Sequence, residues 1–502
     1  MLVLLTRLLI IASIISSIYF CFWGTTTSIW LDEAFSVMMA SHGFKGTIAL
    51  SPADVHPPLY YFLLAVWTKI FGVSEIAIRS LSGLFYLSAI LCIYLIGKTI
   101  YGKNTALLCS FLYLISPVAI LHAQSARSYS LLGLLVILSF LLYLNLLIAN
   151  RNSTTNYVLY IIVNIAGTFT HYLFFFVLFS QIIISFLVAP KNRLRRFMTA
   201  ALLSFMPFLL LWTPVFLAQL SNEGVSWISR PDLKTISRTF RVLIPHTYAY
   251  YAILLIVLFR TGLPKKTFHY FTEFKEFMAQ KQNLAPLLFF IITLSSLLIV
   301  SWFKPIYVPP RGGIILLPSF VLFIGSLLNR FGNKFLIKVF CCGMLIIAIL
   351  VLWPKNSGFD EKYSDKATSK YLITHANDND VIIYTGLNRL AIDYYLDLLK
   401  PSKPFVRITF PSEFDSHPGY LDFDSMLKRK NVFEDESHQV ISGLGKIMKS
   451  DKNIWLIRSQ EYTDPINNIL IDKLNKNYSL REKLDLRGPF HREVLRYQKQ
   501  SN

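Results

Sequence analysis

Residues 79–100 have the sequence RSLSGLFYLSAILCIYLIGKTI, and they decide the class of fold. The charged side chains of this stretch are Arg79 at its start and Lys98 near its end. The hydrocarbon core of a bilayer is about 30 Å thick and is crossed by a helix of roughly 20 apolar residues. Comparable runs recur along the 502 residues, of which 54% are hydrophobic and 16% charged. This composition predicts a polytopic α-helical membrane protein.

The apolar runs predict about eleven transmembrane helices. Their ranges are 3–22, 79–100, 104–121, 128–150, 157–170, 172–189, 197–217, 247–262, 285–302, 312–328 and 335–353. A further run, HPPLYYFLLAVWTKIFG at 56–72, is short, opens near two prolines and contains Lys69. We expect it to form a juxtamembrane or re-entrant helix, because a full span needs a longer apolar run.

Loop charges orient the predicted helices. The loops YGKN, RNSTTN, KNRLRR and NRFGNK, together with the long basic loop after residue 259, then fall on one side. Short loops rich in Lys and Arg mark the cytoplasmic side, so we expect a cytoplasmic N-terminus. The opposite, outer side receives a long first loop, 23–78, several short loops, and everything after about residue 354.

The region after residue 354 differs in kind from the rest. NDNDVIIYTG (377–386) and DKNIWLIRSQ (451–460) are typical of acidic or polar turns followed by buried strands, and a helical pattern follows each of them. Strands that alternate with helices predict a partly parallel sheet. We therefore expect two domains, a transmembrane domain over 1–353 and a small soluble α/β domain over 354–502 on the outer, periplasmic side.

The formal net charge of +20 suits basic loops that touch membrane lipids, so we do not expect nucleic acid as a partner. The chain has five cysteines, which lie in apolar runs and lack metal-ligand spacing with histidine. They do not predict a disulfide framework.

The stretch SIWLDEAFSV (28–37) places Asp32 and Glu33 where the first outer loop begins. A pair of acids also suits the N-terminus of a helix, where the helix dipole favours negative charge. Apolar neighbours such as Trp30 and Phe35, however, should partly desolvate the acids. Desolvation and like charge both raise the pKa of a carboxyl, which suits a general base.

Cations recur at outer helix ends. An isolated arginine at such a position is commonly an interfacial anchor. Several of them on the side opposite the basic loops ask for another reason, and a buried phosphate is the natural one, because guanidinium binds it bidentately. The candidates are Arg79, Arg127, Lys304 and Arg311.

Four further polar residues are candidates. His56 precedes two prolines and Tyr129 follows Arg127 at a helix end, while His171 and Tyr172 interrupt the apolar run GTFTHYLFF. His56 could orient an acid, contact phosphate or bind a metal, or simply be a loop residue in a rigid turn. His171 and Tyr172 suit an interfacial pair as well as a functional one.

These motifs together resemble a known superfamily. WLDEAFS, HPPLYYFLLAVWTKIFG, SEIAIRSLSG, HAQSARSYSLL and KPIYVPPR occur in order over most of residues 1–330. In this the chain resembles the GT-C glycosyltransferases, which are polytopic and use polyprenyl-phosphate sugars. It is most similar to the branch of protein O-mannosyltransferases and bacterial lipid A aminoarabinose transferases.

The resemblance implies roles for individual residues. Asp32 would take the proton from an acceptor hydroxyl, and Glu33 would support it. Arg79, Arg127 and Arg311 would hold the donor phosphate. His56 would shape the first loop, and Tyr129 follows the Arg-x-Tyr pattern of the family. One departure concerns Arg311: the family usually continues Arg-Tyr-Leu, whereas this chain has RGGIILLP (311–318).

The resemblance implies inverting transfer of a sugar to a hydroxyl of a lipid, glycan or protein, at the outer face of a bacterial plasma membrane. No cofactor is required, although a divalent metal near Asp32, Glu33 or His56 is compatible with the residues. A transporter or flippase of lipid-linked sugars is the alternative. It would more often show repeats with broken helices at the bilayer midplane. An inactive assembly partner is a third hypothesis, against which the intact acid pair argues. The identities of the sugar and of the acceptor stay open.

Overall fold

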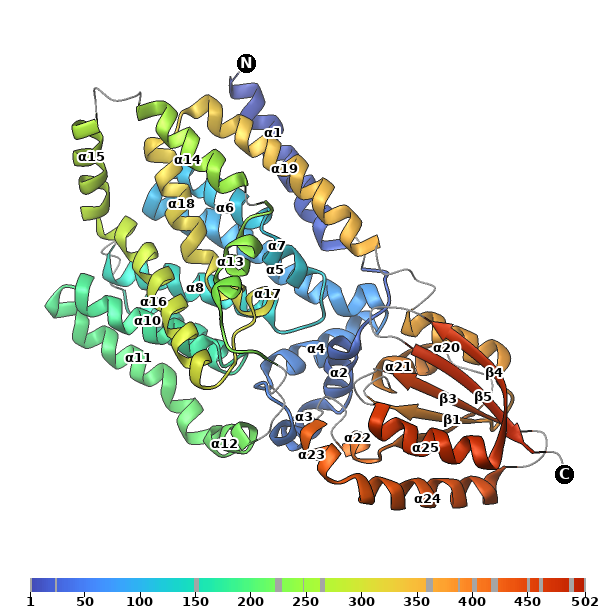
Figure 1. Ribbon diagram of the computed structural model, residues 1–502. Helices are drawn as coiled ribbons and strands as arrows, with labels where there is room; N and C mark the ends of the chain where they lie inside the picture. Colours follow the sequence, from blue (N-terminus) through green and yellow to red (C-terminus); the bar gives the residue numbers. More distant parts are fainter. Residues whose placement is uncertain are drawn as a thin grey trace.

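The computed structural model describes residues 2–22, 25–148, 153–221, 228–246, 248–261, 267–357, 364–386, 389–399, 404–416, 423–448, 452–459, 464–486 and 492–500. Helices make up the part before residue 358, and a mixed sheet with its helices forms the part after it (Figure 1). The first half of the helical part consists of α1 (Leu2–Phe22), α2 (Leu31–Ser41), α3 (Gly43–Leu50), η1 (Ser51–Ala53), α4 (Leu59–Phe71), α5 (Glu75–Tyr101), α6 (Lys103–Leu114), α7 (Pro117–Ala123), α8 (Tyr129–Leu147), α9 (Thr154–Thr168) and α10 (Phe174–Val188).

The helical part continues with a second series of elements. These are α11 (Lys191–Leu211), α12 (Thr213–Ser221), α13 (Leu233–Leu243), α14 (Tyr248–Thr261), α15 (Thr267–Ala279), α16 (Lys281–Phe303), α17 (Pro309–Gly312), η2 (Gly313–Ile315), α18 (Leu317–Phe331) and α19 (Lys334–Ser357). α8 is the central helix, since nearly all its residues are buried by neighbouring helices. An apolar helix of this kind is hydrophobic all round because it packs on every side.

Four helices of the described residues are long and apolar enough to cross a membrane, namely α5, α8, α11 and α16. Two bent pairs, α6 with α7 and α17–η2 with α18, raise that number to six if each pair is one span. Shorter apolar helices occur at Thr6–Phe22, in α4 and in α10. Length and composition of the described helices therefore support several spans.

Two predicted spans are broken. The prediction of one helix over 104–121 is wrong, because α6 and α7 meet at 63° around Ser116, which has extended backbone angles. Pro117 is the first residue of α7, where a helix does not need a backbone N–H. Because proline lacks that N–H, α6 cannot continue through it as one helix. Likewise the predicted span 312–328 begins in the short α17 and η2, and α18 restarts beside Pro318 with a 63° bend.

The segment predicted to form the first outer loop is folded. It forms α2, α3, η1 and α4, and α4 corresponds to the short helix expected within 56–72. Pro58 is the N-cap of α4, and the backbone N–H of Leu59 donates to the carbonyl of Phe169 at 3.0 Å. This bond attaches the loop to the end of α9.

Close helix packing depends on small residues at a few positions. Gly325 of α18 lies so close to Cys109 of α6 that an added Cβ would collide with its Sγ. We expect Gly325→Ala to lower the free energy of unfolding by about 1–3 kcal/mol through overpacking, as measured by thermal unfolding in detergent. Gly343→Ala is the matched control, because a Cβ there meets no atom within 4 Å. Adding Cys109→Ala to the Gly325 variant should recover part of the loss, and an unchanged unfolding temperature in Gly325→Ala would contradict the packing.

The C-terminal part is built on a five-stranded sheet. Its elements are α20 (Asp365–His375), β1 (Val381–Thr385), α21 (Arg389–Leu398), β2 (Val406–Phe410), α22 (Glu413–Ser416), α23 (Phe423–Lys428), α24 (Lys430–Ile447), β3 (Asn453–Ser459), α25 (Asp464–Asn477), β4 (Tyr478–Leu486) and β5 (Arg492–Lys499). The strand order is β2-β1-β3-β5-β4, with β1 parallel to both β2 and β3, and with β5 antiparallel to β3 and β4.

The sheet has a core on each face, as the two-residue period of strands requires. Val381 and Ile383 pack with α24 and α25 on one face, and Ile382 and Tyr384 pack with α20 and α21 on the other. In Figure 1 α21 lies between the sheet and α2. Tyr395 of α21 packs into the hydrophobic core of the helical part. The two parts therefore share a packed interface.

Candidate functional site

The acid pair lies in the first turn of α2. Trp30 is the N-cap with extended backbone angles, and Asp32 and Glu33 follow it. The Glu33 carboxylate accepts the Trp30 backbone N–H at 3.4 Å, which satisfies one of the free donors of the helix start. Successive residues of a helix point about 100° apart, so the two acids face different surroundings.

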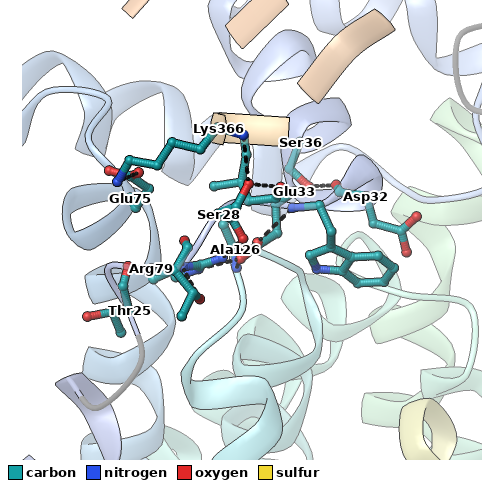
Figure 2. Close-up of polar contacts among 12 residues, drawn as sticks. Thr25, Ser28, Asp32, Glu33, Ser36, Glu75, Arg79, Ala126 and Lys366 are labelled. Carbon is teal, nitrogen blue, oxygen red and sulfur yellow. Dashed lines mark hydrogen bonds and ion pairs between the residues drawn. The ribbon is translucent and has the colours of Figure 1, made fainter. Parts of the chain in front are cut away.

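Glu33 is fully buried and forms a bidentate ion pair with Arg79 of α5 (Figure 2). Nε and Nη2 of Arg79 donate to the two carboxylate oxygens of Glu33 at 2.8 and 2.6 Å. The backbone N–H of Ala126 donates to the same carboxylate at 2.8 Å. A pair with this many charge-assisted hydrogen bonds offsets much of the cost of burying two charges.

The remaining donors of Arg79 bind the chain just before α2. Nη1 donates to the carbonyls of Thr25 and Thr27 at 2.9 and 2.7 Å, and Nη2 donates to the carbonyl of Ser28 at 3.2 Å. A guanidinium has five N–H groups, and these contacts use all of them. Arg79 was expected to hold the donor phosphate. Its N–H groups are instead all used within the protein, so none is left for a phosphate.

Asp32 faces a partly open site instead. One carboxylate oxygen of Asp32 accepts Nη2 of Arg311 at 2.9 Å, and the two side chains are 22% and 30% exposed. The guanidinium of Arg311 also lies over the Trp30 ring, 5.8 Å from its centroid. A charge pair at this exposure stays within reach of a ligand, whereas the Glu33 pair does not.

Arg127 contacts the backbone of Asp32 and is buried. Its Nη1 donates to the backbone carbonyl of Asp32 at 3.0 Å and to Oγ of Ser36 at 3.1 Å. Burial acts to lower the pKa of Arg127, but the charges of Asp32, Tyr61, Tyr129 and Asp54 together outweigh burial and raise the pKa. Among the described residues Nε of Arg127 has no hydrogen-bond partner although it is buried. Such a donor is costly unless a ligand satisfies it.

A cluster of three histidines and one tyrosine adjoins the arginines. His122 stacks on Tyr129 at 4.6 Å between ring centroids, Tyr129 lies 5.2 Å from His171, and His171 lies 5.0 Å from His56. His56, Tyr129 and His171 therefore lie together. The sequence did not predict this, because the three residues belong to separate motifs. His122 was not singled out, although it opens the quoted stretch HAQSARSYSLL.

The surroundings of His56 disfavour its protonated form. Burial lowers the pKa of His56, and the positive charges of Arg127 and Arg311 lower it further, against the opposing effect of Asp54. Nδ1 of His56 lies 3.6 Å from a carboxylate oxygen of Asp54. Burial acts to raise the pKa of Asp54, but its contacts with His56 and other donors outweigh burial and lower it.

Two of the sequence candidates lie farther from Asp32. The Tyr172 hydroxyl donates to Gln219, whose amide donates to the backbone carbonyls of Ser51 and His56 at 2.5 and 3.3 Å. Tyr172 thus holds the loop that carries His56. Nζ of Lys304, an exposed residue, donates to the Leu220 carbonyl at 2.9 Å, away from the acid pair. Within the described residues no group of three or more His, Cys, Asp or Glu could hold a metal ion.

Comparisons with known proteins concern the family and the fold. The family model for dolichyl-phosphate-mannose-protein mannosyltransferase matches residues 55–216. No curated protein sequence matches the chain. Two crystal structures of ArnT from Cupriavidus metallidurans are similar at 10% identity. The form bound to undecaprenyl phosphate has a TM-score of 0.59 over 98% of this chain and 97% of that one. The apo form has a TM-score of 0.61 over 97% of both chains.

The chain therefore has the fold of the two ArnT structures, and its match to the mannosyltransferase family model confirms the resemblance predicted from the sequence. At 10% identity the solved structures define the fold and not the roles of individual residues.

Proposed function

We propose that this protein is a membrane glycosyltransferase that moves a sugar from a polyprenyl-phosphate carrier to a hydroxyl acceptor. The observation that carries the proposal is the difference in burial and partners between the two acids. Glu33 is buried and fully hydrogen-bonded, while Asp32 is partly exposed and paired with Arg311 beside the buried Arg127. A base and two cations at one place match the needs of a glycosyl phosphate.

The proposed step is a direct displacement. Asp32 accepts the proton of the acceptor hydroxyl as the acceptor oxygen bonds to the anomeric carbon. The bond between that carbon and the phosphate oxygen breaks, and its electron pair leaves with the polyprenyl phosphate. Arg127 and Arg311 stabilise the charge that develops on the phosphate. No separate acid is needed for so good a leaving group, so one carboxylate suffices, and the anomeric configuration inverts.

The unpartnered Nε of Arg127 supports the phosphate site, because an anionic oxygen would satisfy it. Arg79 is reassigned in this proposal. Its N–H groups are all in use, so it positions Glu33 and the segment before α2 rather than the phosphate. Glu33 in turn holds the start of α2 through Trp30 and Ala126.

The proposed setting is a bacterial plasma membrane. We infer about eleven spans with a cytoplasmic N-terminus, and the C-terminal α/β part on the periplasmic side with the site. The basic segments 191–196 and 329–334, at helix ends, support this orientation. The donor sugar is a hexose or a pentose, and a lipid, a glycan or a protein remains open as the acceptor.

The proposal is tested with purified protein in liposomes that contain a panel of polyprenyl-phosphate sugars. We expect transfer of sugar to an added lipid, glycan or peptide acceptor together with release of polyprenyl phosphate. Movement of intact donor between leaflets without cleavage would contradict the proposal and favour a transporter.

The departure after Arg311 gives a prediction of its own. A Cβ added at Gly312 would lie 2.7 Å from two ring atoms of Tyr307, so the ring covers this position. We expect Gly312→Ala to displace α17 and to reduce transfer about tenfold, because Arg311 would shift from Asp32. Initial rates of transfer measure the effect. Gly343→Ala should leave the rate unchanged, and a Gly312→Ala variant with the wild-type rate would show that α17 tolerates the shift.

A further inference from the structure

The C-terminal part contacts the segment that leads into the acid pair. α21 packs against α2 (Figure 1). The side chains of Lys366 and Tyr395 reach the start of α5. The Tyr394 hydroxyl also donates to the backbone carbonyl of Val73, just before α5. This interface joins residues more than 300 positions apart in the sequence.

Tyr395 lies buried in this interface and forms hydrogen bonds across it. Its hydroxyl accepts the backbone N–H of Ile29 at 2.8 Å and donates to a carboxylate oxygen of Glu75 at 3.2 Å. Tyr395 is 0% and Ile29 is 1% exposed. Ile29 lies outside any helix, so without the tyrosine its buried N–H would lose this partner.

Lys366 reinforces the same contact. Its Nζ lies 2.8 Å from the carboxylate oxygen of Glu75 that Tyr395 also contacts. Its backbone N–H donates to Oγ of Ser28 at 3.3 Å. Figure 2 shows Lys366 extending over Ser28 toward Glu75, while Asp32 lies on the opposite side of Glu33.

The two contacts converge on residues 25–30. The carbonyls of Thr25, Thr27 and Ser28 hold Arg79, Arg79 holds Glu33, and α2 begins one residue after Trp30. Ser28 and Ile29 are thus fixed by Arg79 from the helical part and by Tyr395 and Lys366 from the C-terminal part. A shift of this segment would turn the first turn of α2 and move Asp32 relative to Arg311.

We propose that Tyr395 and Lys366 are positioning residues for catalysis, through which the C-terminal part sets the direction of Asp32. The inference rests on the proposed function and gives the C-terminal part a role in the reaction beyond any contact with the acceptor. Neither residue contacts Asp32, Arg127 or Arg311 in the described structure, so the turnover number should change more than the KM for the donor.

The test compares Tyr395→Phe with Tyr371→Phe in the full-length protein. Both variants keep the ring and lose a hydroxyl, but the Tyr371 hydroxyl contacts Glu482 within the C-terminal part. Tyr395→Phe should lower kcat about tenfold with the donor KM changed less than about twofold, since small misplacements of a catalytic group reduce rate strongly. Tyr371→Phe should leave both unchanged. Equal kcat values in the two variants would overturn the inference.

A charge swap separates positioning from a general loss of stability. Lys366→Glu should lower kcat, and adding Glu75→Lys should restore most of it because the pair re-forms with reversed sign. Lys370→Glu, one turn later on α20 and exposed, is the matched control and should leave kcat unchanged. Failure of Glu75→Lys to restore any activity to Lys366→Glu would count against the pair.

Hydrogen–deuterium exchange gives a readout without catalysis. Exchange of the backbone N–H groups of residues 25–33 should be faster in Tyr395→Phe than in the wild type and in Tyr371→Phe, while residues of α8 stay protected. If the wild type transfers no sugar, the proposed function fails, and the exchange result still decides whether Tyr395 holds this segment. Unchanged exchange in Tyr395→Phe would overturn the inference even in an active enzyme.

Discussion

Replacing Asp32 with asparagine is expected to reduce the rate of sugar transfer by about a thousandfold, within the range that a positioned general base contributes. Asparagine keeps the size of the side chain but cannot accept the proton of the acceptor. Because Asp32 is 22% exposed, the change should shift the unfolding temperature by no more than a few degrees. Initial rates with a saturating polyprenyl-phosphate sugar measure the loss.

Asp232→Asn is the matched control for this prediction. Asp232 is an exposed N-cap of α13, and asparagine caps a helix about as well as aspartate. Its rate should equal that of the wild type. Transfer that persists in Asp32→Asn at more than about a tenth of the wild-type rate would show that another group takes the proton.

The second large effect concerns the buried pair of Glu33 and Arg79. Arg79→Met should lower the free energy of unfolding by about 3–5 kcal/mol, because it leaves the Glu33 carboxylate buried without a partner. The double variant Glu33→Gln with Arg79→Met should recover most of that loss, since removing both charges avoids the unpaired one. Thermal unfolding in detergent, combined as a double-mutant cycle, measures the coupling.

The exposed pair of Arg429 and Glu413 provides the control. Its side chains are 44% and 34% exposed, so Arg429→Met should cost about 0–1 kcal/mol. A stable Arg79→Met protein that shows only a raised KM for the donor would contradict our assignment. It would return Arg79 to the phosphate-binding role that the sequence suggested.

The sequence located most of the site but not the roles within it. The motifs predicted that Asp32, Arg127 and Arg311 come together, and the structure places Asp32 in contact with both arginines. Which of two adjacent acids faces inward depends on the rotation of α2 about its axis, and a one-dimensional pattern does not contain that rotation. The partner of Arg79 therefore had to come from the structure.

Long-range contacts were beyond the sequence for a different reason. Tyr395 lies in an amphipathic helix, where a buried tyrosine is ordinarily part of a core. Its bond to Ile29 depends on how α21 packs against α2, which no local pattern encodes. The stacking of His122 on Tyr129 is similar, although the spacing of the two residues within one short motif was a signal that could have been used.

The fold was predicted in outline. The hydrophobic runs indicated a polytopic helical protein, and β1 and β3 lie within the two stretches that suggested strands. Hydropathy does not register a bend within an apolar run, so the breaks near Pro117 and Pro318 were missed. Both breaks shape the site, because α7 carries His122 and α17 carries Arg311.

The anomeric configuration of the product tests the central claim most directly. Direct attack by the acceptor, with Asp32 as base, must invert the configuration at the anomeric carbon, whereas a covalent intermediate on an enzyme carboxylate would retain it. A donor of known configuration is incubated with the wild-type protein, and the new glycosidic bond is assigned by NMR coupling constants. We predict inversion with one polyprenyl phosphate released per sugar transferred. A product with retained configuration would contradict the account.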